Sequence, residues 1–437
     1  MSKRFRRITV TLSAILLGFL LIGAVLARNT DDQGPYRQLG VYADVLQRIK
    51  TDYVEEPDLK SVTLGALNGL LESLDPFASY LSAEQYKEYL KNKDAASGRV
   101  GLILSKRFGY LGVVDVIPGS PAAKAGLTTG DMIESIRGIA TRDMPLAYAD
   151  LLLQGQPGTT VDVTVLAIRH PEPKKTTLTR AVIQYPPVTS RMIQDQVGYI
   201  QVQAMMPGTA KEIAQAVRDL EARGAKKLLL DLRHCGAGGP EEGIAVANLF
   251  QDHGLITYLQ GQRYPRKEFA ADPARTITRL PLVLLTNRGT ASGAEIVAAA
   301  LLDSHRAEVV GERTYGDASV RQAISMDDGG AVILSVAKYY SPGGKAIQDT
   351  GVTPTVVVAE TEPIAELDEE APPETPPAPA ERPGEDPILK KALEVAIQGA
   401  AVQAGEPRPR ASAEERDQLD RNRRAMPPNT PSHPPQQ

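Results

Sequence analysis

Ser292 lies in a stretch whose residue types suit a serine nucleophile. From Pro281 to Gly316 the chain reads PLVLLTNRGTASGAEIVAAALLDSHRAEVVGERTYG, in which an apolar run, a Gly/Ser turn and an Ala-rich helical segment follow one another. A turn between a strand and a helix N-terminus exposes a hydroxyl and directs backbone N–H groups at a developing oxyanion. Ser292 and Glu295 also fit the S-x-x-E capping box that begins a helix. The local sequence alone favours this structural role.

The other reactive residue types exclude several kinds of site. Cys235 is the single cysteine, so the chain cannot form an intramolecular disulfide. We expect no metal site and no cofactor, because the histidines form no HExxH motif and no Cys/His cluster. A net charge of −4 and a pI near 5.9 argue against a nucleic-acid-binding surface. The five histidines are scattered through the chain: His170, His234, His253, His305 and His433.

The N-terminus predicts export. Basic residues at positions 3, 4, 6 and 7 precede an uncharged, mostly apolar stretch over residues 8–27. This order is typical of a signal peptide or a membrane anchor, and about twenty apolar residues suffice for either. We assign residues 1–28 to this segment and leave both alternatives open. Because the basic flank stays inside, either one places the rest of the chain in the periplasm or on the extracytoplasmic face of the cell membrane.

Composition and periodicity divide the rest of the 437-residue chain into several regions. Residues 35–95 are predicted to be helical, with periodic apolar positions over 35–52 and 62–74 and a break at Asp75-Pro76. Residues 188–360 alternate strands and helices, which indicates an α/β layer. The predicted strands are 197–202, 227–232, 281–285 and 331–340, and the predicted helices are 209–222 and 243–250. A Pro/Glu/Ala-rich linker (361–385), a helix (386–401) and a disordered tail (405–437) are expected to follow.

Residues 97–183 carry short β-like runs separated by Gly and Pro. This region resembles a PDZ domain at Val100-Gly101-Leu102-Ile103, in the segment PGSPAAKAGL, and at Gly130-Asp131-Met132-Ile133. The resemblance implies that a peptide C-terminus adds as an extra strand, with its carboxylate held by backbone N–H groups near Val100, Gly101, Leu102 and Ile103. The structural alternative is a small barrel without a ligand.

Taken in order, five blocks make the chain similar to the carboxyl-terminal processing peptidases, also called tail-specific proteases. The resemblance covers roughly residues 35–401. It implies a helical N-terminal region, a PDZ domain and an α/β serine-peptidase core, that is, an α/β and β multi-domain protein. The blocks are LESLDPFASYL, the PDZ-like segment, LLLDLRHCGAGG, TASGAEIVAAALLD with RAEVVGERTYG, and YYSPGGKAIQDTGVTP.

The resemblance also implies the roles of particular residues. Ser292 takes the position of the nucleophile. The family's general-base lysine falls at Asp317, and its supporting glutamine falls at Arg321. The oxyanion region corresponds to Gly236, Ala237 and Gly238, preceded by Cys235 where the family has asparagine.

These departures weaken the expected chemistry. An aspartate with a reference pKa of about 3.9 is a poor base unless burial raises its pKa. Loss of one member of a serine-protease catalytic unit costs about 10⁴ to 10⁶ in rate. His234 could replace the missing base, although a solvated or core histidine at a strand end is the favoured interpretation. Lys338 and Lys345 are expected to be surface charges, and Asp317 itself could hydrogen-bond turn amides.

Two functions therefore compete. One is an exported serine endopeptidase that binds unfolded or C-terminal protein segments and cleaves them with Ser292. The other is a pseudo-peptidase that binds C-terminal tails through its PDZ domain as a scaffold. The sequence leaves homo-oligomerisation open.

Overall fold

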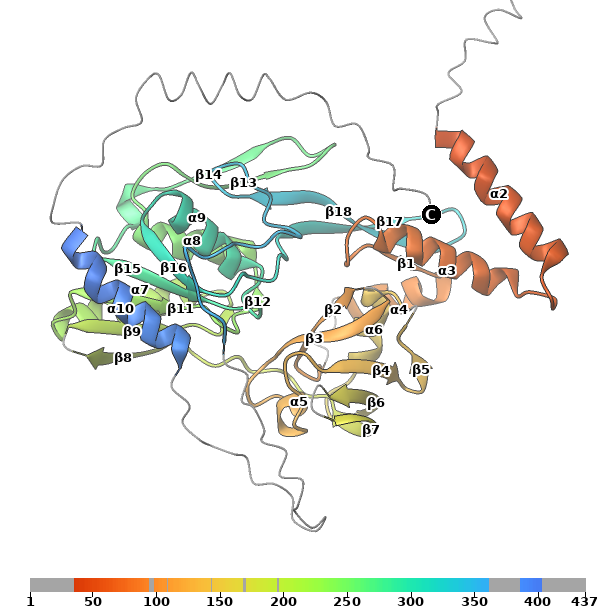
Figure 1. Ribbon diagram of the computed structural model, residues 1–437, viewed down its shortest axis with the longest axis horizontal. Coiled ribbons are helices and arrows are strands. Elements are labelled where there is room, and N and C mark those ends of the chain that lie inside the picture. Colours follow the sequence, from red (N-terminus) through yellow and green to blue (C-terminus); the bar gives the residue numbers. More distant parts are fainter. Residues whose placement is uncertain are drawn as a thin grey trace, which may run out of the picture. The chain divides into compact units, whose positions relative to one another are not determined.

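The computed structural model describes residues 35–93, 98–107, 109–142, 144–167, 170–194, 196–360 and 386–402 (Figure 1). The predicted signal peptide or anchor, the predicted linker 361–385 and the predicted tail 405–437 lie outside these residues. No helix in the described ranges combines the length and the apolar character that a bilayer crossing requires. The chain separates into two units, Met1–Leu74 and Asp75–Gln437.

The first unit contains two helices, α2 (Pro35–Asp52) and α3 (Leu59–Glu72). Helix α2 has the predicted bounds. Helix α3 begins three residues before the predicted start at residue 62, because Asp58 caps it by accepting the Lys60 N–H and the Ser61 hydroxyl. Both helices predicted from the apolar positions at 35–52 and 62–74 are therefore present.

The second unit begins with a β domain built around one twisted sheet. Its strand order is β2-β3-β4-β6-β7, with β5 paired to β4, and all of these pairs are antiparallel. Strand β2 stands at the edge of the sheet and, among the described strands, pairs only with β3. The elements are β2 (Leu102–Arg107), β3 (Tyr110–Val116), α5 (Pro121–Lys124), β4 (Met132–Ile136), β5 (Ile139–Ala140), α6 (Leu146–Leu153), β6 (Thr160–Ala167) and β7 (His170–Thr179).

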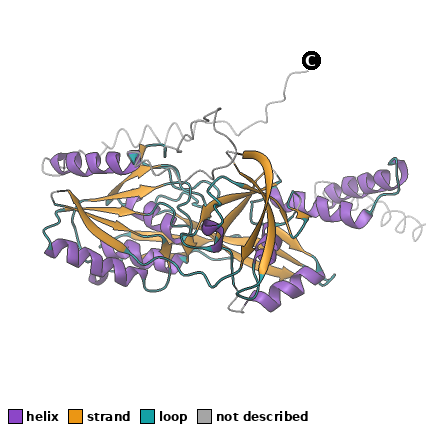
Figure 2. Ribbon diagram, turned by 90° about the horizontal axis from the view of Figure 1, so that it is seen from below, coloured by secondary structure: helices purple, strands orange, loops and turns teal. Residues whose placement is uncertain are grey.

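A second, mostly parallel sheet forms the α/β core, in the order β19-β16-β15-β11-β9-β8. Its strands are β8 (Thr189–Gln194), β9 (Val197–Gln201), β11 (Lys227–Asp231), β15 (Leu282–Thr286), β16 (Ala307–Gly311) and β19 (Val356–Val357), of which only β8 pairs antiparallel. Helices flank both faces (Figure 2): α7 (Thr209–Ala222), α8 (Pro240–Phe250) and α9 (Gly293–Asp303) on one, α10 (Pro387–Val402) on the other.

Side-chain alternation explains this two-faced burial. Leu228 and Leu230 of β11 join the core under α7, α8 and α9, whereas Leu229 between them joins the cluster under α10. Successive residues of a strand point to opposite faces, so a sheet covered on both sides needs continuous apolar runs. This requirement is why the runs at 227–232 and 281–285 predicted buried strands correctly.

A third sheet lies beside the core and carries part of the candidate site. Its order is β1-β18-β13-β14, with β17 paired to β18. Two further short strands, β10 (Ala204–Met205) and β12 (Ala237–Gly238), pair in parallel next to the turn that follows β11. The remaining elements are β1 (Ser79–Leu81), α4 (Ala83–Lys93), β13 (Leu255–Gln260), β14 (Lys267–Ala270), the 3₁₀ helix η1 (Pro273–Arg275), β17 (Ser319–Ser325) and β18 (Ala331–Tyr340).

Candidate active site

Ser292 stands immediately before α9, on the loop that leaves the carboxyl end of β15. Its backbone has φ 55° and ψ −122°, a conformation that residues with a Cβ rarely adopt. Its hydroxyl donates to the carbonyl oxygen of Gly238 at 2.9 Å. The loop therefore holds the hydroxyl over the turn after β11, where the sequence predicted the oxyanion region.

Glycines allow this close approach of loop and helix. A Cβ on Gly293 would come within 2.4 Å of the Gly239 carbonyl oxygen, and one on Gly243 within 2.2 Å of the Gly293 carbonyl oxygen. Both contacts are with backbone, which cannot yield as a flexible side chain can. Larger residues at these positions would separate the start of α9 from α8 and displace Ser292.

Glu295 fixes the position of Ser292 relative to the turn at Asp317. Its carboxylate is fully buried and accepts hydrogen bonds from the N–H groups of Ser292 (3.1 Å), Gly316 (2.7 Å) and Asp317 (2.7 Å), and from the Thr314 hydroxyl (2.5 Å). Burial raises the pKa of Glu295 to about 7, although these hydrogen bonds oppose the shift. The sequence identified Glu295 as a helix cap but missed that it joins two loops. The available signal was a carboxylate inside an Ala/Ile/Leu-rich helix.

Asp317 and Arg321 form an ion pair at the positions where the family has lysine and glutamine. Burial raises the pKa of Asp317 above its usual value, and the neighbouring Arg321 guanidinium offsets only part of this rise. The guanidinium carbon of Arg321 also lies 3.7 Å from the centroid of the Phe77 ring, a cation–π contact. The expectation that Asp317 hydrogen-bonds turn amides is wrong: its carboxylate pairs with Arg321, and Glu295 accepts the amides of the turn.

One cavity brings most of the candidate residues together. It has a volume of about 240 Å³, and Ser292, Asp317 and Arg321 share its wall with residues of the turn after β11. No histidine or lysine is among the described residues that line it. The full lining is Gly236, Gly238, Pro240, Ser292, Ile296, Asp317, Ala318, Ser319, Arg321 and Tyr339.

The turn after β11 presents a hydrogen-bond acceptor to Ser292. Gly238 has φ 112°, and its carbonyl oxygen accepts the Ser292 hydroxyl, while the next N–H, that of Gly239, donates to Met205. Cys235 is fully buried, its carbonyl oxygen accepts the Ala291 N–H at 3.1 Å, and burial raises the pKa of its thiol. Gly236 and Gly238 thus reach the cavity, whereas Cys235 packs in the core.

A second cavity connects the β domain with the candidate site. Its volume is about 320 Å³, and it runs from the start of β2, past α6, to the turn after β11 and to Asp317 and Arg321. The four predicted peptide-binding residues all line it. The lining residues are Phe77, Arg99, Val100, Gly101, Leu102, Ile103, Leu104, Ile117, Leu146, Asp150, Leu153, Gln154, Tyr185, Gly236, Ala237, Gly238, Asp317 and Arg321. We call this cavity the β2–α6 groove.

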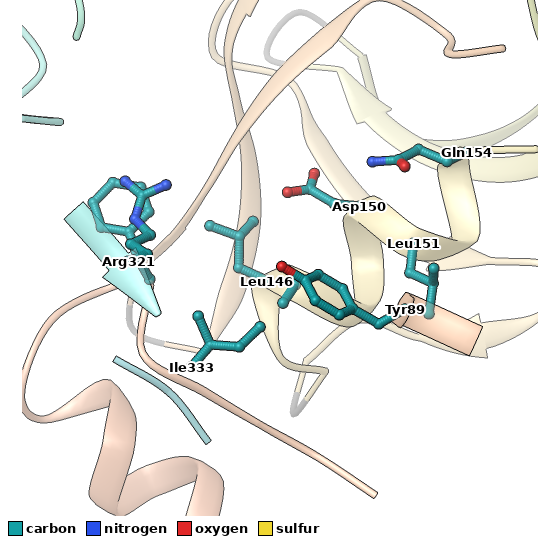
Figure 3. Close-up of a pocket in the computed structure, with 9 residues that line it drawn as sticks. Tyr89, Leu146, Asp150, Leu151, Gln154, Arg321 and Ile333 are labelled. Atoms are coloured by element: carbon teal, nitrogen blue, oxygen red, sulfur yellow. The ribbon is translucent and has the colours of Figure 1, made fainter. Parts of the chain in front are cut away.

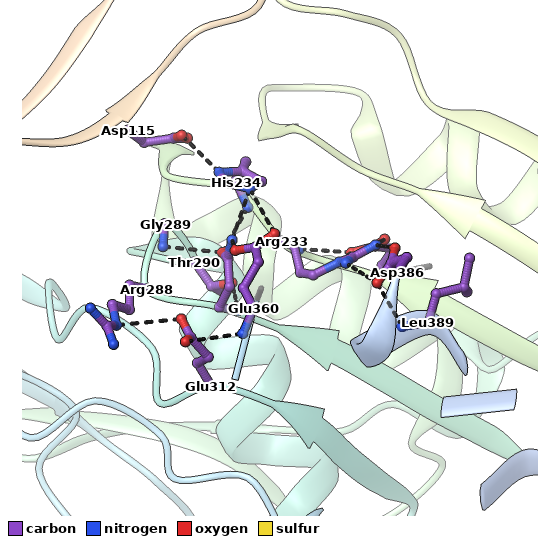
Figure 4. A network of polar contacts seen from close by, with 12 residues as sticks. Asp115, Arg233, His234, Arg288, Gly289, Thr290, Glu312, Glu360, Asp386 and Leu389 are labelled. Atoms are coloured by element: carbon purple, nitrogen blue, oxygen red, sulfur yellow. Dashed lines mark hydrogen bonds and ion pairs between the residues drawn. The ribbon is translucent and has the colours of Figure 1, made fainter. Parts of the chain in front are cut away.

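His234 does not line the Ser292 cavity, and its ring contacts Asp115 of the β domain (Figure 4). Its Nδ1 lies 2.9 Å from Asp115 Oδ1 on β3, and its Nε2 lies 2.9 Å from Asn287 Nδ2 and 3.6 Å from Glu360 Oε1. Burial lowers the pKa of His234, but Asp115 and Glu360 together raise it to about 10. The hypothesis that His234 replaces the missing base is therefore wrong, because its Nδ1 is bound to Asp115 and the ring does not line the Ser292 cavity.

The neighbouring Arg233 attaches α10 to the core (Figure 4). Its guanidinium binds Asp386, which precedes α10, through two hydrogen bonds of 2.9 and 2.8 Å, and it also binds Asp231 at the end of β11. Lys338 pairs with Asp349 at 2.8 Å and is about one-third exposed, in agreement with the predicted surface charge. These groups support the scaffold and lie outside the Ser292 cavity.

Two regions of the chain match the sequence profiles of known protein families. Residues 196–358 match peptidase family S41, and residues 112–166 match the PDZ domain.

Individual relatives extend the similarity to most of the chain. The carboxy-terminal-processing protease of Bartonella bacilliformis is 31% identical over 349 residues, which cover 79% of this chain and 80% of that protein. The carboxyl-terminal-processing protease of a Synechocystis species is 33% identical over 318 residues, covering 71% and 74%. The solved structure of a photosystem II D1 C-terminal processing protease matches with a TM-score of 0.60 and 29% identity, covering 75% of this chain and 88% of that one.

Proposed function

The chain belongs to peptidase family S41, among the carboxyl-terminal processing serine proteases, and we propose that Ser292 is its nucleophile and Asp317 its proton acceptor. The membership confirms the family resemblance, the PDZ domain and the peptidase core. The roles of individual residues are our proposal. The observation that carries it is that Ser292 and Asp317 line one cavity and that Glu295 binds the backbone N–H of both.

In the proposed reaction, the Ser292 hydroxyl leaves the Gly238 carbonyl oxygen and its Oγ bonds to the carbonyl carbon of the scissile peptide. The hydroxyl proton passes to Asp317 and then to the leaving amine as the C–N bond breaks. Water hydrolyses the resulting ester. The raised pKa of Asp317 makes it a better proton acceptor than an exposed aspartate, but Arg321 limits this gain. We therefore expect slow turnover compared with a lysine-dependent relative.

Substrate capture is assigned to the β2–α6 groove. A peptide C-terminus would extend the sheet at the free edge of β2, with its carboxylate at Val100, Gly101, Leu102 and Ile103. The same groove reaches Gly236–Gly238 and Asp317, which supports a path from the bound tail to Ser292. Unfolded segments and protein C-termini are the proposed substrates.

One observation favours a second function. Arg321 pairs with Asp317 and opposes the effect of burial on the pKa of Asp317, which reduces the basicity of the carboxylate. If this effect dominates, the protein is a catalytically impaired pseudo-peptidase that binds tails as a PDZ scaffold. The basic N-terminus followed by an apolar stretch supports an extracytoplasmic location for either function.

A cleavage assay distinguishes the two functions. The full-length chain is incubated with an unstructured protein substrate, and wild type is compared with Ser292→Ala and Asp317→Asn. We expect slow cleavage by wild type, none by Ser292→Ala, and at least a tenfold loss in Asp317→Asn. Equal cleavage by wild type and Ser292→Ala would exclude Ser292 as the nucleophile. Tail binding without cleavage by wild type would identify the scaffold.

A further inference from the structure

Asp150 is an exposed carboxylate of α6 that makes no hydrogen bond or ion pair with any described residue. It borders two cavities at once, the β2–α6 groove and a neighbouring pocket of about 190 Å³. Figure 3 shows its carboxylate projecting from α6 toward the side of that pocket where Arg321 lies. The proposed reaction does not use this group.

The spacing along α6 places Asp150 opposite one particular residue of a bound tail. The chain just after α6 lies beside the chain just before Val100, because the backbones of Gly98 and Gly155 pair at 2.6 and 3.1 Å. Gln154 therefore lies beside the terminal residue of a tail on β2. Asp150 precedes Gln154 by four positions, about 6 Å along the helix axis.

The side chains of a strand added to β2 are spaced at nearly the same interval as Asp150 and Gln154 on α6. Its side chains face α6 at every second residue, about 6.6 Å apart. The side chain two residues before the C-terminal residue would therefore come opposite Asp150. Leu146 and Leu153 flank Asp150 on the groove-facing side of α6 and provide apolar contact for the stem of that side chain.

Of the charged groups around the groove, Asp150 is the one that lacks a partner of opposite charge when a tail is bound. Arg321 is already paired with Asp317. Arg99 adjoins Val100, where the carboxylate of the tail would bind. The negative charge of that terminal carboxylate would then balance the positive charge of Arg99. Asp150 keeps an exposed carboxylate that no described side chain pairs, so a cationic side chain of the tail could pair with it.

We propose that Asp150 makes the β2–α6 groove selective for C-terminal tails with lysine or arginine two residues before the C-terminal residue. This inference rests on the proposed binding of tails in the groove. It assigns a substrate class, basic at one position, to an otherwise general tail-binding site.

Fluorescence anisotropy with labelled ten-residue peptides tests this proposal. The peptides differ only at the third residue from the C-terminus, which is Lys, Gln or Glu, and the Lys peptide is also made as a C-terminal amide. The full-length Ser292→Ala chain is used so that no peptide is cleaved. Asp150→Asn is compared with Glu134→Gln, which removes an exposed carboxylate of the same domain outside the groove.

We expect the Lys peptide to bind about fivefold to tenfold more tightly than the Glu peptide, and less selectively at high salt. Asp150→Asn should reduce this ratio to below twofold, Asp150→Lys should invert it, and Glu134→Gln should leave it unchanged. An unchanged ratio in Asp150→Asn would overturn the selectivity alone. If the free acid and the amide bind equally, or neither binds, tail capture by the groove is wrong and the inference fails with it.

Discussion

Removal of the Glu295 carboxylate should make the loops at Ser292 and Asp317 more mobile and lower the stability of the fold. In Glu295→Ala, the buried N–H groups of Ser292, Gly316 and Asp317 lose their acceptor. Each buried donor left unpaired costs about 1–3 kcal/mol, and partial relaxation of the loops gives an expected loss of about 3–5 kcal/mol in the free energy of unfolding. For a core of this size the melting temperature should fall by about 6–20 °C.

The assay combines thermal unfolding with hydrogen–deuterium exchange of the peptide that covers residues 314–317, both at pH 8. The Gly316 and Asp317 amides should exchange much faster in Glu295→Ala than in wild type. Glu295→Gln should show an intermediate effect, because its amide oxygen can still accept from Ser292 and Asp317. The control Glu268→Gln removes an exposed carboxylate and should change stability by less than about 0.5 kcal/mol. Unchanged melting and exchange in Glu295→Ala would refute the assigned role of Glu295.

Two further predictions concern charges around the site. Asp317→Lys alone should not restore fast cleavage, because the new ammonium group would face the Arg321 guanidinium. The double variant Asp317→Lys, Arg321→Gln should cleave at least tenfold faster than wild type in the peptidase assay. Equal cleavage rates for the single and the double variant would contradict this coupling of the two positions. The raised pKa of His234 stabilises the folded state fully below about pH 6.5, and this contribution is lost as the pH rises toward 10. Urea unfolding between pH 6.5 and 10 should therefore show a smaller pH-dependent loss of stability in His234→Asn than in wild type, and equal slopes would exclude His234 as the titrating group.

The sequence predicted the regular elements well where their periodicity was strong. Helix α7 and strand β18 have the predicted bounds, because one has a clear apolar stripe and the other a long run of β-forming residues. Helix α8 begins at Pro240, three residues earlier than predicted, since proline is favoured in the first turn of a helix. Such boundary shifts do not affect the site.

The residues that join separate segments could not be predicted in the same way. Ser292, Asp317 and Arg321 do share one cavity, as alignment with the family implied. The contact of His234 with Asp115, however, links residues 119 positions apart in the sequence, and it depends on how the β domain meets the loop after β11. The positive φ of His234 directs its ring, and no local pattern encodes that angle. The role of Glu295 was missed for the same reason.

The central claim is that Ser292 is a nucleophile whose proton passes to Asp317. Labelling of the full-length chain at pH 8 with a fluorophosphonate, followed by mass mapping of the peptides, tests it most directly, because this reagent reports nucleophilicity without any peptide substrate. We predict a phosphonyl adduct on Ser292 that forms slowly in wild type, at least tenfold more slowly in Asp317→Asn, and not at all in Ser292→Ala. An unmodified Ser292 in folded wild-type protein, or an equal labelling rate in Asp317→Asn, would contradict the claim.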